Sequence, residues 1–235
     1  MKKKFIHTYV SVDCVILGFD GEQINILLVK KDKANENALK LPGSLIYDDE
    51  DVDDAAHRVL FERTGVKSKA LVQFRCFASP DRASSDEDMA WLDVEYQPNI
   101  NRLITVAYLS LLRIDQKLNN ISKYKETQWC PLSEMPKLPF DHNLVVTSSL
   151  HEIRRWIELD SSLVYELLPR KFIISQLHKL HEAIYDKKID IRNFHKKITS
   201  LPYINVLEEK QKNVSHRAAR FYKFNRQAYN KIRGI

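Results

Sequence analysis

The most informative part of the chain reads Leu41-Pro42-Gly43-Ser44-Leu45-Ile46-Tyr47-Asp48-Asp49-Glu50 and, after four more residues, Ala55-Ala56-His57-Arg58-Val59-Leu60-Phe61-Glu62-Arg63-Thr64-Gly65-Val66. Apolar residues recur here at the spacing of one helix face, namely Val52, Ala55, Ala56, Val59 and Leu60. Gly65 follows them, and glycine is the residue type that ends helices in the left-handed conformation. The stretch predicts a loop, a helix over about residues 51–63 and a glycine cap.

This pattern resembles the Nudix box, in which glutamates on one helix build a divalent-metal site. The matching residues are Glu50, Arg58, Glu62 and Gly65. Ser44 stands at the family's glycine, and Val59 and Arg63 replace two of its glutamates. Pyrophosphate hydrolysis needs hard oxygen ligands that hold magnesium, because the metal neutralises phosphate charge and orients water. A cation at roughly 4 Å instead repels the metal by about 4 kcal/mol per unit charge. We therefore expect no catalytic residue, no metal ligand, no cofactor and no pyrophosphate hydrolysis.

Charge is divided unevenly along the 235 residues, a length that suits one large domain or two modest ones. Residues 169–235 hold 16 lysines and arginines against 5 acidic residues, a net charge of +11. Because the whole chain carries +6, residues 1–168 carry −5. This asymmetry indicates a polyanionic partner for the C-terminal part alone, the alternative being a solvated basic surface.

The cysteines and the hydropathy pattern indicate the cellular location of the protein. Cys14, Cys76 and Cys130 lie in apolar, strand-like surroundings without metal-ligand spacing, and their odd number argues against a disulfide framework. They are expected to be core thiols in a reducing cytosol. No stretch approaches the roughly 18 apolar residues of a membrane span, and no signal-peptide core follows the basic start. We therefore expect a cytoplasmic protein with no membrane partner.

The N-terminal part combines strands and helices. The predicted strands are Tyr9–Leu17, Ile24–Val29, Ala70–Phe77, Leu103–Leu112 and Thr127–Leu132. Besides the helix over about 51–63, a second helix is predicted over Asn143–Leu159, where apolar residues recur on one face. An acidic stretch, Ser84–Glu95, has the composition of an insertion. This order of elements indicates an α/β sandwich.

The C-terminal part predicts helices followed by a basic hairpin. The expected helices are Leu163–Leu168, Ile174–Tyr185 and, capped by Asp190, Ile191–Leu201. Phe194 and Ile198 point inward from the third helix, which leaves its basic residues outside. Tyr203–Leu207 and Ala219–Phe224 are strand-like. Such an arrangement is a winged helix, whose third helix enters the major groove while the hairpin contacts phosphates.

Together these segments resemble the Nudix-related transcriptional regulators of the NrtR type, and among them the arabinose-responsive branch (AraR). Beyond the box, the likeness lies in Phe77-Ala78-Ser79-Pro80-Asp81-Arg82, Thr105-Val106-Ala107-Tyr108-Leu109, Trp129-Cys130-Pro131-Leu132, Phe140-Asp141-His142, Arg192-Asn193-Phe194-His195-Lys196-Lys197 and Ala218-Ala219-Arg220-Phe221-Tyr222. The resemblance implies an α/β Nudix-like sandwich plus a winged helix-turn-helix. The effector-sensing domain would span 1–142, a connecting helix 143–159 and the DNA-binding domain 160–235. The insertion at 84–95 departs from this pattern.

Two effectors compete for the sensor: ADP-ribose, which the resemblance implies for several members, and a free pentose such as L-arabinose. Six carboxylates are expected beside the cleft, those of Asp48, Asp49, Glu50, Asp51, Asp53 and Asp54. Without a metal they repel a pyrophosphate, which favours L-arabinose, although Arg63 can stand in for the metal and pair with a phosphate. The pocket candidates are Asp13, Lys40, Arg75, Asp81 and Arg82. For each of them a structural ion pair is the alternative.

DNA recognition is expected on the third helix and the hairpin. The candidates for base edges are Arg192, Asn193 and Lys196, and those for phosphates are Lys197, Lys212, Arg217 and Arg220. A good bidentate contact from Arg or Asn gives about 1–3 kcal/mol of discrimination between bases. Because single modules bury only roughly 600–1,000 Å², we expect a homodimer on a palindromic double-stranded operator. Ligand would change the separation of the two recognition helices, with the helix over 143–159 carrying the motion.

The preferred prediction is a repressor of sugar catabolism that senses L-arabinose through a catalytically degenerate Nudix domain. An ADP-ribose-sensing regulator is the first alternative. Two functions from other classes also remain open. A residual Nudix hydrolase predicts magnesium-dependent turnover of ADP-ribose, and an RNA-binding protein would use the same basic half but prefer unpaired bases.

Overall fold

The computed structural model of the protein describes residues 6–30, 38–68, 70–83, 85, 88, 102–114, 118, 127–212 and 218–234. The chain divides into two compact units. The first comprises Met1–Gly18 and Asn25–Glu152, and the second comprises Phe19–Ile24 and Ile153–Ile235. No helix among the described residues is long and apolar enough to cross a membrane.

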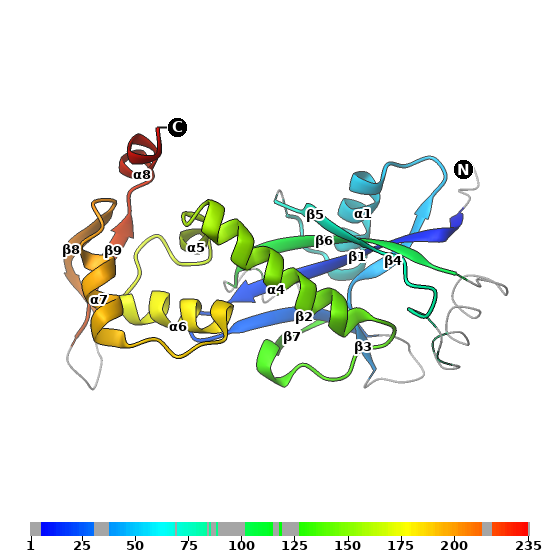
Figure 1. Ribbon diagram of the computed structural model, residues 1–235, viewed down its shortest axis with the longest axis horizontal. Helices are drawn as coiled ribbons and strands as arrows, with labels where there is room; N and C mark the ends of the chain where they lie inside the picture. The colour runs from blue at the N-terminus through cyan, green and yellow to red at the C-terminus, as the bar shows by residue number, and fades with distance from the viewer. Residues whose placement is uncertain are drawn as a thin grey trace. The chain divides into compact units, whose positions relative to one another are not determined.

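Described residues of the first unit build most of a seven-stranded sheet. Its strands are β1 (Ile6–Phe19), β2 (Ile24–Lys30), β3 (Leu39–Lys40), β4 (Gly43–Tyr47), β5 (Val72–Phe77), β6 (Ile104–Arg113) and β7 (Thr127–Pro131). The order is β3-β2-β1-β6-β5, while β4 pairs with β1 and β7 with β2 (Figure 1). β1 therefore lies at the centre, where both faces of a strand are covered.

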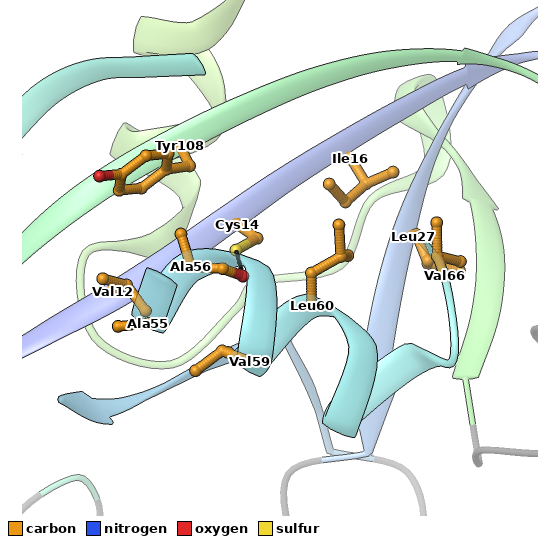
Figure 2. Packing of buried hydrophobic residues seen from close by; sticks show 10 residues of the cluster. All are labelled: Val12, Cys14, Ile16, Leu27, Ala55, Ala56, Val59, Leu60, Val66 and Tyr108. Carbon is orange, nitrogen blue, oxygen red and sulfur yellow. Dashed lines mark hydrogen bonds between the residues drawn. The ribbon is translucent and has the colours of Figure 1, made fainter. Parts of the chain in front are cut away.

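Helix α1 (Val52–Thr64) packs on this sheet, and buried residues of the helix and the sheet form a hydrophobic core (Figure 2). The side chains of Val12, Cys14 and Ile16 alternate onto one face of β1, as a strand requires. Ala55, Ala56, Val59 and Leu60 face them from α1 and are at most 1% exposed. The Asp51 carboxylate caps the helix by accepting the N–H of Asp53, and Gly65 ends it in the left-handed conformation with φ 73°.

Helix α4 (His142–Leu159) belongs to both units, because its residues up to Glu152 group with the sheet and those from Ile153 with the second unit. A short 3₁₀ helix, η1 (Leu132–Glu134), precedes it. The Asn143 side chain fixes the approach to α4 by accepting the N–H of Leu138 at 2.7 Å. The buried residues of α4 include Val146 and Ile153, each 1% exposed.

The second unit contains the helices α5 (Leu163–Glu166), α6 (Ile174–Tyr185), α7 (Ile191–Thr199) and α8 (Arg226–Arg233) and the hairpin β8 (Ile204–Lys210)–β9 (Arg220–Phe224). Phe172 adds a bridge to Tyr222 beside the hairpin, with backbone hydrogen bonds of 3.0 and 2.7 Å. Tyr165 stacks on Phe224 with ring centroids 4.4 Å apart. Aromatic rings thus join the helices to the hairpin.

The fold class predicted from the sequence is confirmed: an α/β Nudix-like sandwich followed by a winged helix. Strands β3 and β4, the 3₁₀ helix η1 and helix α8 were not predicted. Strand β4 lies in the stretch expected to be a loop before the box helix. The expectation that all three cysteines are core thiols was wrong for Cys76, which is exposed on β5.

Candidate functional sites

Arg58 pairs with both carboxylates that remain in the box. Its Nε donates to Glu50 Oε2 at 2.8 Å, its Nη2 donates to Glu50 Oε1, and its Nη1 donates to Glu62 Oε2 at 3.1 Å. The side chains of Arg58 and Glu50 are 15% and 11% exposed. Burial alone would lower the pKa of Arg58, but the two carboxylates raise it above its usual value. The Glu50 carboxylate therefore holds the loop before α1 to the helix, whereas the Glu62 pair lies within the helix.

The positions at which the sequence departs from the box carry no carboxylate. Val59 is fully buried in the core, where a glutamate would lose its hydration. Arg63 is half-buried and brings a positive charge. Among the described residues, no three His, Cys, Asp or Glu side chains are grouped to hold a metal ion.

A second charged cluster is buried around Arg82, which lies in the turn after β5. Its Nη2 donates to Asp141 Oδ1 at 2.8 Å and to Asp13 Oδ2 at 3.3 Å, and its Nε reaches both Asp141 oxygens at 3.2 Å. The side chains of Arg82, Asp13 and Asp141 are 2%, 8% and 14% exposed. Asp13 comes from the central strand and Asp141 directly precedes α4, so Arg82 joins the sheet to the start of this helix.

His142, the first residue of α4, completes the cluster as a neutral imidazole. Its Nδ1 accepts the N–H of Leu41 at 3.3 Å, so the proton of the neutral ring lies on Nε2, which is 3.6 Å from Asp13 Oδ1. Burial lowers the pKa of His142 to about 4, against the opposing effect of the Asp13 charge. Burial by itself would raise the pKa of Asp13, but the charge of Arg82 and that of His142, which is protonated in the acid range where Asp13 titrates, bring it below its usual value.

Asp13, Arg82 and His142 line a small cavity together with Lys40 and Gly43. The cavity has a volume of about 20 Å³, which is room for one water molecule. Gly43 pairs with Asp13 in the β1–β4 ladder, and a Cβ at Gly43 would lie 2.1 Å from Asp13 Oδ1. Glycine at this position therefore lets the Asp13 carboxylate lie over β4.

One donor in this cluster is unsatisfied. Arg82 Nη1 is buried and has no hydrogen-bond partner among the residues that the structure describes. Leaving a buried donor without an acceptor costs about 1–3 kcal/mol, and more when the group is charged. The cluster therefore offers a cationic donor to a water or a ligand that brings an oxygen acceptor.

Helix α7 presents a basic surface of a different kind. The Asp190 carboxylate caps it by accepting the N–H of Asn193 at 2.8 Å, while Phe194 and Ile198 are buried. Arg192, Lys196 and Lys197 are exposed. In the described part of the chain none of these three cations has an ion-pair partner. The helix leaves its positive charge available to an external polyanion.

Two family profiles match the chain: the NUDIX domain over residues 7–148 and the NrtR DNA-binding winged helix domain over residues 164–224. The chain belongs to the Nudix-related transcriptional regulators of the NrtR type. The likeness to the ADPR responsive transcriptional repressor NtrR of Acinetobacter baylyi is 22% identity over 234 residues, covering 97% of this chain and 87% of that one.

Solved structures of the same family share this fold. The crystal structure of Shewanella oneidensis NrtR is 19% identical, covers 93% of this chain and 95% of its own, and superposes with a TM-score of 0.61. The same protein complexed with a 27mer DNA gives a TM-score of 0.63 at 19% identity, with 94% and 95% covered. At this identity the likeness extends to the fold of the regulator family, and the side chains of each site have to be judged on their own geometry.

The five effector candidates fall into two groups in this regulator. Asp13, Lys40 and Arg82 line the cavity described above. Arg75 and Asp81 are exposed, and Arg75 Nη1 instead donates to Ser148 of α4 at 3.4 Å. Sequence reasoning missed Asp141 and His142 as members of the cluster, although both belong to a stretch that carries the family resemblance.

The DNA-binding candidates are exposed wherever the structure describes them. Arg192, Asn193, Lys196 and Lys197 lie on α7, Lys212 follows β8 and Arg220 begins β9. Arg217 lies outside the described residues. Around the helix, Arg192 and Lys196 are opposite the buried residues, whereas Asn193 and Lys197 line a pocket of the same unit.

The acidic stretch expected beside the cleft lies elsewhere. None of the six carboxylates from Asp48 to Asp54 lines the Arg82 cavity. Asp51 caps α1, Asp53 accepts from the Tyr108 hydroxyl, and Glu50 is paired with Arg58. The charge argument that favoured a neutral sugar therefore loses its basis. Most of the insertion at 84–95 lies outside the described residues, but Asp88 accepts the N–H of Phe140 at 3.1 Å.

Proposed function

We propose that the protein is a DNA-binding repressor whose Nudix domain senses ADP-ribose. The buried, unsatisfied Nη1 of Arg82 beside the Lys40 side chain is the observation that carries the effector assignment. A cationic donor without an acceptor suits a ligand with negatively charged oxygens, because charge-assisted hydrogen bonds are the stronger ones. The relative in Acinetobacter baylyi, named as an ADPR responsive repressor, supports the same choice across nearly the whole chain.

L-Arabinose is the weaker candidate. It was favoured because six carboxylates were expected to repel a pyrophosphate, and none of them lines the cavity. No relative described above is named for a sugar. A pentose hydroxyl is a weaker acceptor for the Arg82 Nη1 donor than a negatively charged oxygen is. The assignment to an arabinose-responsive branch therefore has no support in the side chains of this site.

DNA binding rests on α7 and the hairpin. In a winged helix the exposed face of the third helix reads base edges and the basic hairpin holds phosphates. Arg192 and Lys196 have the outward position that contact with bases requires, and Lys212 and Arg220 are exposed on the hairpin. A homodimer on a palindromic operator remains our prediction, because a single module buries little surface.

The effector signal starts at α4. The cavity is far smaller than ADP-ribose, so the ligand enters only if Arg82 changes its contacts with Asp13 or Asp141. Asp141 and His142 form the start of α4, which continues into the second unit. A ligand that prefers the rearranged cluster weakens DNA binding by the ratio of its affinities for the two states.

The protein is not a hydrolase in this proposal. Glu50 and Glu62 are both paired with Arg58, and the remaining box positions carry Val59 and Arg63. Magnesium catalysis needs carboxylates that are free to bind the metal. We expect ADP-ribose to stay intact with magnesium present. The absence of hydrolase activity would be contradicted by turnover that exceeds a metal-free blank and is lost in a Glu62→Gln variant.

Calorimetric titration of the full-length protein with ADP-ribose and, separately, L-arabinose tests the effector assignment. We expect binding of ADP-ribose alone. Arg82→Gln should weaken it at least about tenfold, while Arg75→Gln, at an exposed arginine outside the cavity, should leave it unchanged.

Because Arg82→Gln leaves two buried carboxylates unpaired, the double variant Arg82→Gln/Asp141→Asn serves as a second test that keeps the net charge of the cluster. Heat on titration with L-arabinose but not with ADP-ribose would overturn the assignment. Operator affinity that is equal with and without saturating ADP-ribose would remove the proposed switch.

A further inference from the structure

A pocket of about 540 Å³ opens within the second unit, between the start of α5, the end of α6 and the flank of α7. Its lining includes Tyr165, His181, Tyr185, Phe194, Lys197 and Tyr203. This volume lies within the roughly 300–1,000 Å³ typical of small-molecule sites. The pocket belongs to the winged helix and is separate from the Arg82 cavity, which is built from residues of the first unit.

Aromatic rings form its walls. The imidazole of His181 stacks on Tyr185 with centroids 6.0 Å apart and planes inclined by 15°, and it meets Phe194 edge-on at 5.2 Å. Tyr165 and Tyr203 meet edge-on at 6.5 Å. Flat walls of this kind suit a planar aromatic ligand, because such rings gain from stacked and edge-to-face contacts with one another.

Several polar groups in the pocket have no partner. Among the described residues, the ring nitrogens of His181, the hydroxyl of Tyr165 and the ammonium of Lys197 take part in no hydrogen bond or ion pair. The Asp190 carboxylate at the rim is already used as the α7 cap. Lys197 therefore has no ion-pair partner among the described residues, and the groups beside it can donate hydrogen bonds.

His181 is neutral at physiological pH. Burial lowers its pKa to about 4, and the charges of Lys197 and His178 act in the same direction. A neutral imidazole donates one hydrogen bond and accepts another, so it does not compete with Lys197 for an anion.

We propose that this pocket binds a small planar aromatic molecule that carries a carboxylate or a phosphate. The ring lies among Tyr165, His181 and Phe194, and the anionic group pairs with Lys197. A phosphate and a carboxylate make the same demand on an ammonium group, namely negatively charged acceptor oxygens. Neither a bare anion nor a neutral ring uses both features of the site.

Calorimetric titrations of the full-length protein test this with four probes. Adenosine 5′-monophosphate and indole-3-carboxylate combine a ring with an anion, whereas inorganic phosphate and indole each lack one half. We expect both aromatic anions to bind at least about tenfold more tightly than phosphate or indole. Absence of binding by both aromatic anions at millimolar concentration overturns the proposal, as does equal binding of inorganic phosphate.

Two neighbouring lysines on α7 give a matched pair of variants. Lys197→Met should weaken the aromatic anions about tenfold or more, while Lys196→Met, on the outward face, should leave them unchanged. Arg82→Gln/Asp141→Asn tells whether adenosine 5′-monophosphate binds in the Nudix domain instead. Equal loss in both lysine variants, or loss of binding only in the Nudix-domain variant, contradicts the assignment.

A second readout uses DNA. If Lys197 contacts a phosphate of DNA, as the proposed function expects, indole-3-carboxylate should lower the operator affinity of the wild type but not of Lys197→Met. Ligand binding without any change in DNA affinity supports the pocket and removes Lys197 from the DNA contacts. Failure of the protein to bind duplex DNA at all would reject the proposed function and leave the ligand titrations unaffected.

Discussion

Helices α1 and α7 both carry arginine, but they use this charge in opposite ways. In α1, Arg58 lies between Glu50 and Glu62, and its guanidinium makes hydrogen bonds to both. In α7, Arg192 and Lys196 are exposed and have no ion-pair partner among the described residues. The same residue types stabilise the fold in the first helix and remain available to a partner in the second.

The difference follows from what each helix faces. The first turn of α1 is approached by a loop that must be held in place, and a half-buried arginine can satisfy several acceptors at once. Among the described residues no side chain pairs with the cations on the outer face of α7, so these cations keep their hydration until a polyanion replaces it. Charge that is paired contributes to stability, and charge that is unpaired contributes to binding.

The replacement Arg58→Met tests the first half of this comparison. It keeps the aliphatic stem but leaves Glu50, which is 11% exposed, without its counter-charge. We expect a loss of about 4 kcal/mol in the free energy of unfolding, because breaking a buried pair on one side leaves an uncompensated charge. Urea denaturation followed by tryptophan fluorescence measures the loss.

Arg192→Met is the matched control on α7 and should change the stability by less than about 0.5 kcal/mol. Glu62→Gln should also have a small effect, because the Glu62 side chain is 54% exposed. Equal destabilisation by Arg58→Met and Arg192→Met would contradict the claim that paired charge on α1 stabilises the fold and unpaired charge on α7 does not.

These helices could be predicted from the sequence because their signals are local. An Asp cap followed by apolar residues at helical spacing gave the start of α7, and Gly65 gave the end of α1. Helix α8 offered similar signals, an Asn225 cap and a left-handed Gly234, but its few apolar residues hid the helical period. Strand β4 was missed because it has only five residues and is stabilised by pairing with the distant strand β1, which the local sequence does not indicate.

The buried cluster could be predicted only in part, because its members are far apart in the chain. Arg82 meets Asp141 across 59 residues and Asp13 across 69, and no spacing rule links such positions. Arg75 and Arg82 were equally good candidates from the sequence, since Arg75 lies in the predicted strand Ala70–Phe77 and Arg82 follows it closely. Only the packed structure separates them, by exposing the first and burying the second.

Lowering the pH tests whether His142 is neutral in the folded protein and whether its protonation destabilises the first unit. His142 has a pKa of about 4 in the folded protein and about 6.5 when unfolded, so the unfolded state binds more protons below pH 6.5. Its stabilising contribution is therefore complete above pH 6.5 and is lost as the pH falls towards 4. We expect this to amount to about 3 kcal/mol.

Urea denaturation at several pH values measures this loss, and His142→Asn should remove most of it. An asparagine oxygen can still accept the N–H of Leu41 that now donates to Nδ1 of the ring. Burial also lowers the pKa of His181 to about 4, so His181→Gln should remove a separate part of the slope. A pH dependence that is the same in wild type and His142→Asn would show that the imidazole is charged in the folded state.

The unpaired charges of α7 should appear in DNA binding instead of stability. Arg192→Ala is expected to cost about 2 kcal/mol of operator affinity and to relax the preference for one base pair. Competition binding with an operator selected from random duplexes measures both effects. Arg226→Ala is the control, because Arg226 is equally an exposed arginine of the second unit but is paired with Glu166 at 2.8 Å. Equal losses in the two variants would mean that α7 does not read bases.

Two lysines of the second unit repeat the comparison on a smaller scale. Lys212, beside the hairpin, is exposed and has no ion-pair partner in the described part of the chain, whereas Lys171 is paired with Glu209. Each phosphate contact adds about 0.9 to the slope of log affinity against log salt concentration, so Lys212→Ala should lower the slope by about 1 and weaken all duplexes alike. Lys171→Ala should change it less, because removing that lysine leaves Glu209 to repel the DNA without removing a counterion-releasing contact. Titrations at several salt concentrations distinguish the two, and a larger change of slope for Lys171→Ala would show that pairing within the protein does not decide which cations meet the phosphates.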